Sequence, residues 1–228
     1  MITLEDYKLD NIDPEDFGDT LLKLEKSFGI KFEYNTFKDA KTFGDICDCI
    51  ESQINFTNKE DCTTQQAFYK VRNAISLTQN IDKKNIETQT QLETVFPRQN
   101  RRQKVKEFKQ ELGISIDLLS MKTWLVLTIV IGFTSSIIAF FFSWKVAVCG
   151  LLFFYILNSI LSKFSKEIKV ETVGHLAEKI TQEYYSQARR HSKTVNRSEI
   201  VKTIQDVFIA EHFLEREHLT REAQLGWK

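Results

Sequence analysis

The sequence predicts an all-α protein, made of two small helical bundles and a two-helix transmembrane hairpin. Three observations lead to this prediction: a long apolar block, short amphipathic segments on both sides of it, and motifs that occur twice. The 228 residues include 31 Lys and Arg and 31 Asp and Glu, yet residues 124–162 carry one charge, Lys145. A net charge of zero argues against a globally basic nucleic-acid binder, so no nucleic-acid partner is expected.

The apolar block divides into two segments, each long enough to cross a bilayer. Residues 124–142 and 146–162 contain no charged side chain. As helices rising about 1.5 Å per residue they reach roughly 25–28 Å, close to the thickness of the hydrocarbon core. Ser143–Lys145 form the turn between them. The alternative is a hairpin buried in a soluble core, but the rest of the chain is too small and too polar to cover it.

Basic residues flank the block on both sides and predict its orientation. The positive-inside rule then places both termini on the cytoplasmic side of a bacterial-type inner membrane. Some of these cations are candidate contacts for anionic lipid headgroups, at about 1 kcal/mol per residue; the alternative is a solvated helix face that only sets the topology. The candidate headgroup contacts are Arg98, Arg101, Arg102, Lys104 and Lys106, and Lys109, Lys122, Lys163, Lys166 and Lys169 complete the flanks.

Helical spacing of apolar residues predicts six further helices in the polar parts of the chain. The clearest is residues 14–28, with Asp13 as its N-cap, Pro14 at its first position and Gly29 as its stop. The others lie at 42–50, 64–77, 98–112, 172–180 and 198–213.

Three short motifs occur twice in the chain. Leu24–Ile30 (LEKSFGI) has a counterpart in Phe108–Ile114 (FKQELGI), and Thr42–Ile46 (TFGDI) has one in Thr172–Leu176 (TVGHL). The third pair is IETQTQL at residues 86–92 and LTREAQL at 219–225. Each type of element is therefore present in two copies.

All three motifs resemble the acyl carrier protein family. In that family a helix I and a long loop precede helix II, which ends in L-E-x-x-F-G-I, and the last helix opens with T-V-G-D-L. The resemblance implies two such bundles in a permuted order. Residues 1–60 would be helices II to IV of the first bundle, 61–118 the first part of the second, 119–165 the transmembrane hairpin, 166–190 the last helix of the second, and 191–228 the helix I and loop that complete the first. An alternative assembly pairs 64–77 with 13–55 and leaves the C-terminal helix to complete a neighbouring molecule, so a homo-oligomer stays open.

The resemblance also identifies what is missing. Acyl carrier proteins attach phosphopantetheine to a Ser fourteen residues before the Phe of F-G-I, and those positions hold Pro14 and Arg98 here. Neither side chain has a hydroxyl group, so no covalent cofactor is expected. In the family an acidic helix II docks on basic partners, which implies a docking face here. Its candidate residues are Glu15, Asp16, Asp19 and Glu25, and a merely solvated face is the alternative.

No catalytic or metal-binding pattern occurs. G-x-S-x-G, H-E-x-x-H and phosphate-loop motifs are absent, and His212 and His218, six residues apart, fall on different faces of a helix. We therefore expect a non-enzymatic, membrane-anchored docking or scaffold protein, linked to lipid or acyl-chain enzymes as partners and in contact with membrane lipid. The alternatives are a structural subunit of a membrane complex, packed through Gly132, Ser135, Ser136 and Gly150, and a non-covalent acyl-chain sensor or carrier.

Overall fold

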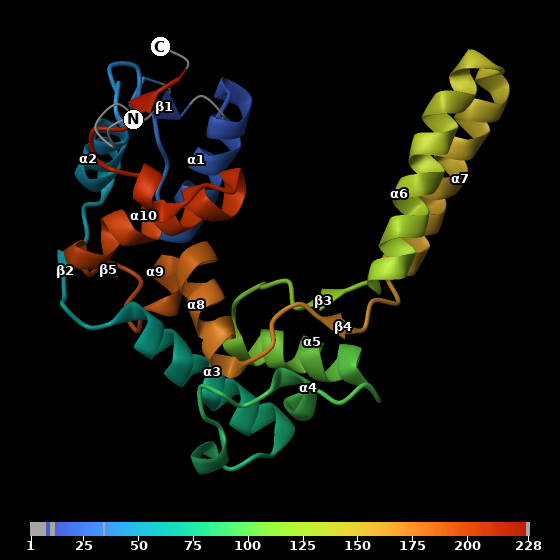
Figure 1. Cartoon of the computed structure of the whole chain (residues 1–228). Coiled ribbons are helices and arrows are strands. Elements are labelled where there is room, and N and C mark those ends of the chain that lie inside the picture. The colour runs from blue at the N-terminus through green and yellow to red at the C-terminus, as the bar shows by residue number, and fades with distance from the viewer. Residues whose placement is uncertain (1–7, 10–11, 34, 227–228) are drawn as a thin grey trace. The chain divides into compact units, whose positions relative to one another are not determined.

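The computed structural model describes residues 8–9, 12–33 and 35–226, and it is mostly helical, with 62% of the chain in helices (Figure 1). The predicted helical class is confirmed at this level. Contacts group the chain into two compact units. The terminal unit comprises residues 1–73 and 174–228, and the central unit comprises residues 74–173.

The terminal unit is built around three helices from opposite ends of the sequence. α1 (Pro14–Phe28) and α2 (Phe43–Gln53) both contact α10 (Arg197–His212). Figure 1 shows red α10 crossing between the blue and cyan helices. Phe28, Phe43, Ile46, Ile204 and Phe208 are fully buried in one shared apolar core. The C-terminal helix thus packs against the first two helices of its own chain.

Local sequence signals fix where α1 and α2 begin and end. The carboxylate of Asp13 accepts hydrogen bonds from the N–H groups of Glu15 and Asp16, and Gly29 ends α1 with a φ of +69°. Thr42 and Asp45 form a reciprocal capping box at the start of α2. The observed bounds of α1 are those that the sequence predicts.

Two short parallel strand pairs and two small helices complete the terminal unit. β1 (Lys8–Leu9) pairs with β6 (Gln224–Leu225), and β2 (Thr57–Asn58) pairs with β5 (Thr194–Val195). The small helices are α9 (Tyr185–Ala188) and η4 (Arg216–His218). These strands have two residues each, so they form short pairings and not a sheet layer, and only the β1–β6 pair lies near the two ends of the chain.

The boundary between the units differs from the one drawn from the sequence. The predicted second bundle includes residues 61–73 and 174–190, whereas these residues group with the terminal unit by their contacts. One reason is Tyr185, which is 1% exposed and packs its ring 5.2 Å from that of Phe28. Consequently α3 (Thr63–Gln79) runs from one unit into the other, and nearly all of α8 (Val173–Glu183) belongs to the terminal unit.

The central unit contains the hairpin and the elements at its base. η2 (Lys83–Asn85), α4 (Leu92–Val95) and α5 (Arg101–Leu112) precede it, and β3 (Leu119–Ser120) pairs antiparallel with β4 (Glu167–Ile168) around it. α5 begins three residues later than predicted, after Asn100, whose φ is +58°. Pro97 also disfavours a helical conformation in the residue before it.

The hairpin consists of α6 (Thr123–Ile138), continued by η3 (Ala139–Phe141), and α7 (Trp144–Ser162). In Figure 1 the two helices run side by side. A Cβ atom at Gly132 would lie 2.2 Å from the ring of Phe154, and one at Gly150 would lie 2.5 Å from Ser136 Oγ. These small residues therefore allow α6 and α7 to approach each other closely.

Both hairpin helices are long and apolar enough to cross a membrane. Within their most apolar stretches only 17% and 6% of the residues are buried, which is unlike the core helices of a soluble protein. The two predicted spans are thus present as helices, and their apolar side chains remain uncovered by the described chain.

Two of the three repeated motifs meet in the same way in both copies. Thr42 forms an antiparallel bridge with Gln224, and Thr172 forms one with Gln91. The N–H of Phe43 donates to the Ala223 carbonyl, and the N–H of Val173 donates to the Thr90 carbonyl. In the third motif, Gly29 and Gly113 both end their helices with a positive φ. The repeated sequences therefore make repeated contacts.

We predict that Phe208→Ala destabilises the terminal unit by about 3–5 kcal/mol, because it empties a fully buried aromatic site. The Phe208 ring lies 5.3 Å from that of Phe43 and 6.3 Å from that of Phe17. The measurement is denaturant unfolding in mild detergent, with hydrogen exchange of α1 and α2. The control, Phe213→Ala, removes a side chain that is 94% exposed. Equal losses in the two variants would contradict the shared core.

Candidate functional site

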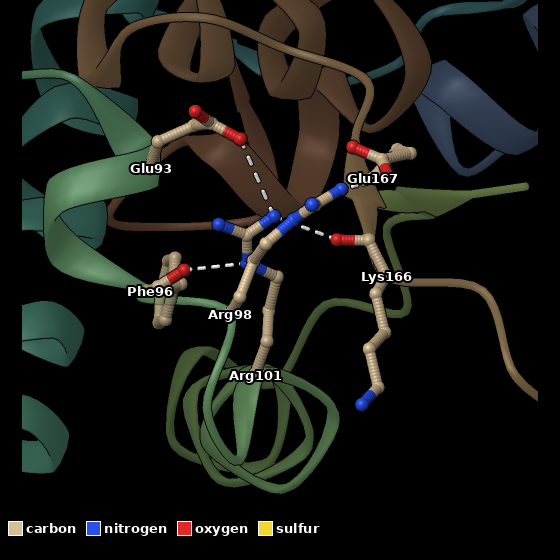
Figure 2. A network of polar contacts seen from close by, with 6 residues as sticks. All are labelled: Glu93, Phe96, Arg98, Arg101, Lys166 and Glu167. Carbon is tan, nitrogen blue, oxygen red and sulfur yellow. Dashed lines mark hydrogen bonds and ion pairs between the residues drawn. The ribbon is translucent and has the colours of Figure 1, made fainter. Parts of the chain in front are cut away.

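The base of the hairpin is organised by a buried arginine from α5. Arg101 is 2% exposed. Its Nε donates to the Phe96 carbonyl at 2.6 Å, and its Nη1 donates to the Lys166 carbonyl at 2.6 Å. Glu93 lies 3.4 Å from Nη1, so the guanidinium sits among three acceptors (Figure 2). Arg101 thereby ties the start of α5 to the segment that leaves α7.

This geometry corrects one of the predicted headgroup contacts. The Arg101 guanidinium is enclosed and bonded to the protein, so it is not available to lipid. A sequence signal for this burial exists: Arg101, Val105 and Phe108 follow the i, i+4, i+7 spacing of one helix face, and all three are buried.

The other four predicted headgroup contacts are accessible to different degrees. Arg102 and Lys106 are exposed and Lys104 is half-buried. Arg98 forms an ion pair with Glu167 of β4, which neutralises much of its charge (Figure 2). A second ion pair, between Asp117 and Lys169, joins the residues next to β3 and β4, the strands that lead into and out of the hairpin.

A cavity of about 350 Å³ lies where the hairpin meets these strands. Arg98, Lys122, Lys166 and Glu167 supply its charged side chains. Its apolar lining comes from both hairpin helices and their flanking residues, namely Met121, Leu125, Leu161 and Phe164. The structure thus brings Arg98 together with two lysines that the headgroup prediction did not include.

The predicted acidic face divides into an exposed part and a buried part. Glu15, Asp16 and Asp19 are exposed on the first half of α1. Within the described ranges, none of these three carboxylates forms an ion pair. They therefore form a free anionic surface, which we call the α1 acidic surface.

Glu25 does not belong to that surface. It is 9% exposed and accepts hydrogen bonds from Lys31 Nζ at 2.5 Å and from the Phe32 N–H at 2.7 Å. Burial alone would raise the pKa of Glu25, but these hydrogen bonds and the Lys31 charge outweigh it and lower that pKa. Glu25 holds the chain after Gly29, a loop contact that helical spacing does not reveal.

The positions where a carrier protein has its modified Ser lack a hydroxyl group here. Pro14 is the first residue of α1, and Arg98 lies in the loop before α5. The nearby hydroxyl groups of α1 are buried: Thr20 donates to the Asp16 carbonyl, and Ser27 donates to the Gln182 carbonyl at 2.5 Å. Neither is accessible to a modifying enzyme.

Two other side chains of reactive types, a histidine and a cysteine, are held within the fold. His212 Nε2 lies 2.8 Å from Thr20 Oγ1, and burial lowers the pKa of this histidine. Burial raises the pKa of Cys47 to about 12, which keeps that thiol protonated and unreactive at neutral pH. Among the residues that the structure describes, no cluster of His, Cys, Asp or Glu could hold a metal ion.

Comparisons with protein-family models, with curated proteins and with solved structures give no match to this chain. Its function therefore has to be argued from its own residues.

We predict that Arg101→Gln loosens the base of the hairpin, because it leaves the Phe96 and Lys166 carbonyls without their donor. Each buried, unpaired carbonyl costs about 1–3 kcal/mol. The readout is hydrogen exchange at the Lys169 amide, which donates to the Leu118 carbonyl beside the β3–β4 pair. That amide should exchange faster in Arg101→Gln than in the wild type. The control is Arg102→Gln, which removes the same charge from an exposed site and should leave the exchange rate unchanged. If the Lys169 amide exchanged at the wild-type rate in Arg101→Gln, Arg101 would not hold the base of the hairpin together.

Proposed function

We propose that this protein is a membrane-anchored docking protein without enzymatic activity. In this proposal α6 and α7 cross a bacterial-type inner membrane, and permuted acyl-carrier-like bundles lie on the cytoplasmic side. The α1 acidic surface then recruits a protein partner with a basic surface, such as an enzyme of lipid or acyl-chain metabolism.

Membrane anchorage is supported by the uncovered apolar surface of the hairpin. Phe141 and Phe142 at its tip are 89% and 88% exposed, and Trp124 and Trp144 near its ends are 61% and 64% exposed. Aromatic residues at both ends of a span are typical of membrane–water interfaces. The basic residues flank the end of the hairpin opposite the tip, which supports a cytoplasmic base.

The acyl-carrier-like architecture is supported by the repeated contacts of the repeated motifs. Thr42 and Thr172, each directly before a helix, pair with Gln224 and Gln91. Gly29 and Gly113 each end a helix with a positive φ. Covalent carrier activity is disfavoured because Pro14 and Arg98 replace the serine.

The observation that carries the docking role is the α1 acidic surface, with three exposed carboxylates within five residues of one helix. Unpaired charges of one sign attract a surface of opposite sign and speed its association. Leu22, which follows on the same helix, is 59% exposed and can add an apolar contact beside the charges. The alternative packing role has less support, because Gly132, Ser136 and Gly150 already serve contacts within the hairpin and only Ser135 is exposed.

We predict that Glu15→Gln/Asp16→Asn/Asp19→Asn reduces partner recovery. Full-length protein in mild detergent is the bait, and co-purified proteins are quantified by mass spectrometry. Recovery of proteins with basic surfaces should fall by about tenfold, the equivalent of ~1.4 kcal/mol of lost attraction, and it should fall for the wild type when the salt concentration is raised.

The matched control is Glu60→Gln/Asp61→Asn/Glu87→Gln, which removes three exposed carboxylates elsewhere. Its recovery should equal that of the wild type. Glu15 and Asp16 also stabilise the N-terminus of α1, so the thermal stability of each variant is measured alongside. Equal recovery by both triple variants, or a loss that follows stability alone, would refute the docking surface.

A further inference from the structure

We propose that the cavity at the base of the hairpin binds the phosphate group of an anionic phospholipid between Lys122 and Lys166. This inference rests on the membrane anchorage proposed above but not on the acyl-carrier resemblance or the docking role. It names a lipid class and a specific site, whereas the sequence predicts only a diffuse basic segment.

The charges around the cavity leave two cations without partners. Arg98 and Glu167 neutralise each other as an ion pair. Lys122 and Lys166 are exposed, and neither ammonium makes an ion pair within the part of the chain that the structure describes. Figure 2 shows the side chain of Lys166 turned away from the Arg98 and Arg101 guanidinium groups. The rim therefore carries a net positive charge that an anion can neutralise.

The position of the two lysines fits the depth of a phospholipid headgroup. Lys122 immediately precedes α6, and Lys166 lies four residues after the end of α7, so both stand at the same end of the hairpin. The apolar helices begin directly beyond them. Ammonium groups at this boundary lie at the level of lipid phosphates, with their aliphatic stems along the apolar region.

The start of α6 adds a second attraction for an anion. Lys122 occupies the N-cap position, and its side chain makes no capping hydrogen bond. Unpaired N–H groups and the helix dipole at this end favour negative charge. An anion there would meet the helix terminus and the Lys122 ammonium together.

The apolar part of the cavity distinguishes a lipid from a free anion. Leu125 of α6 and Leu161 of α7 line it, together with Phe164, which is 67% exposed. A free phosphate ion gains nothing from these side chains. A phospholipid places its glycerol and upper acyl chain against them while its phosphate meets the lysines, so the same cavity satisfies both parts of one molecule.

The test uses full-length protein in nanodiscs of phosphatidylcholine with one-fifth phosphatidylglycerol, followed by native mass spectrometry of the retained lipids. The wild type should retain phosphatidylglycerol in preference to phosphatidylcholine. Lys122→Gln/Lys166→Gln should reduce that preference by about tenfold or more, because it removes both unpaired cations that line the cavity. The control, Lys83→Gln/Lys84→Gln, removes two exposed cations that neither line the cavity nor belong to the predicted headgroup contacts, and it should retain the preference.

Each other outcome overturns a defined part of the inference. Equal retention of both lipids by the inserted wild type refutes the site and leaves the anchorage standing. Equal losses in the two double variants show general charge attraction and refute the site as well. Displacement of phosphatidylglycerol by millimolar inorganic phosphate identifies a free-anion site instead of a lipid site. Failure of the wild type to enter nanodiscs refutes the anchorage, and the lipid site with it.

Discussion

Most of the large apolar side chains that are exposed in the described chain lie on α6 and α7, among them Ile131, Phe153 and Tyr155. Full exposure of an Ile or Phe side chain to water, instead of burial, costs roughly 1.5–3 kcal/mol. The contact between the two helices covers only one side of each: Ile129, Gly132 and Ser136 are the buried residues of α6, and Ala147 is the buried residue of α7. The uncovered apolar surface of α6 and α7 is therefore the constraint on which the rest of the structure depends.

The base of the hairpin, in contrast to its helices, is polar and is held to neighbouring segments by several contacts. The β3–β4 pair and the Asp117–Lys169 ion pair join the two ends of the hairpin to each other. Arg101 and the Arg98–Glu167 ion pair join the segment after α7 to α5 and to the loop before it. These contacts use backbone carbonyls and charged groups, which are stable at a membrane surface but costly inside hydrocarbon. The chain thus changes from apolar to charged contacts within a few residues of Lys122.

Much of this architecture could be predicted from short-range signals. Asp13, Pro14 and Gly29 define α1 because capping and backbone geometry are local, and the hairpin follows from apolar length alone. The bonding partners of the buried charges could not be assigned in the same way. Glu25 pairs with Lys31 through the loop after α1, and Arg101 bonds to a carbonyl sixty-five residues away. The first contact depends on how the loop folds back onto α1 and the second on a tertiary contact, although helix-face spacing alone indicates that Arg101 is buried.

The predicted bundles and the two compact units divide the chain differently for a related reason. The sequence repeats assign residues 166–190 by likeness to a carrier bundle, whereas packing assigns most of them by where Tyr185 is buried. The sequence identifies the charged residues of the candidate sites, but it does not show which of them are exposed. Lys122 and Lys166 were counted only for topology, because nothing in the linear sequence shows that the two flanks line one cavity.

The central claim is that the hairpin spans a bilayer with its base on the cytoplasmic side. The most direct test labels single cysteines with a membrane-impermeant maleimide, in sealed bacterial spheroplasts that express a variant lacking Cys47, Cys49, Cys62 and Cys149. Ser143→Cys places the thiol in the turn between α6 and α7, and Gln99→Cys places it in the exposed loop before α5. The account predicts that Ser143→Cys is labelled from outside and that Gln99→Cys is labelled only after the membrane is opened. Equal labelling of both cysteines from one side would contradict it.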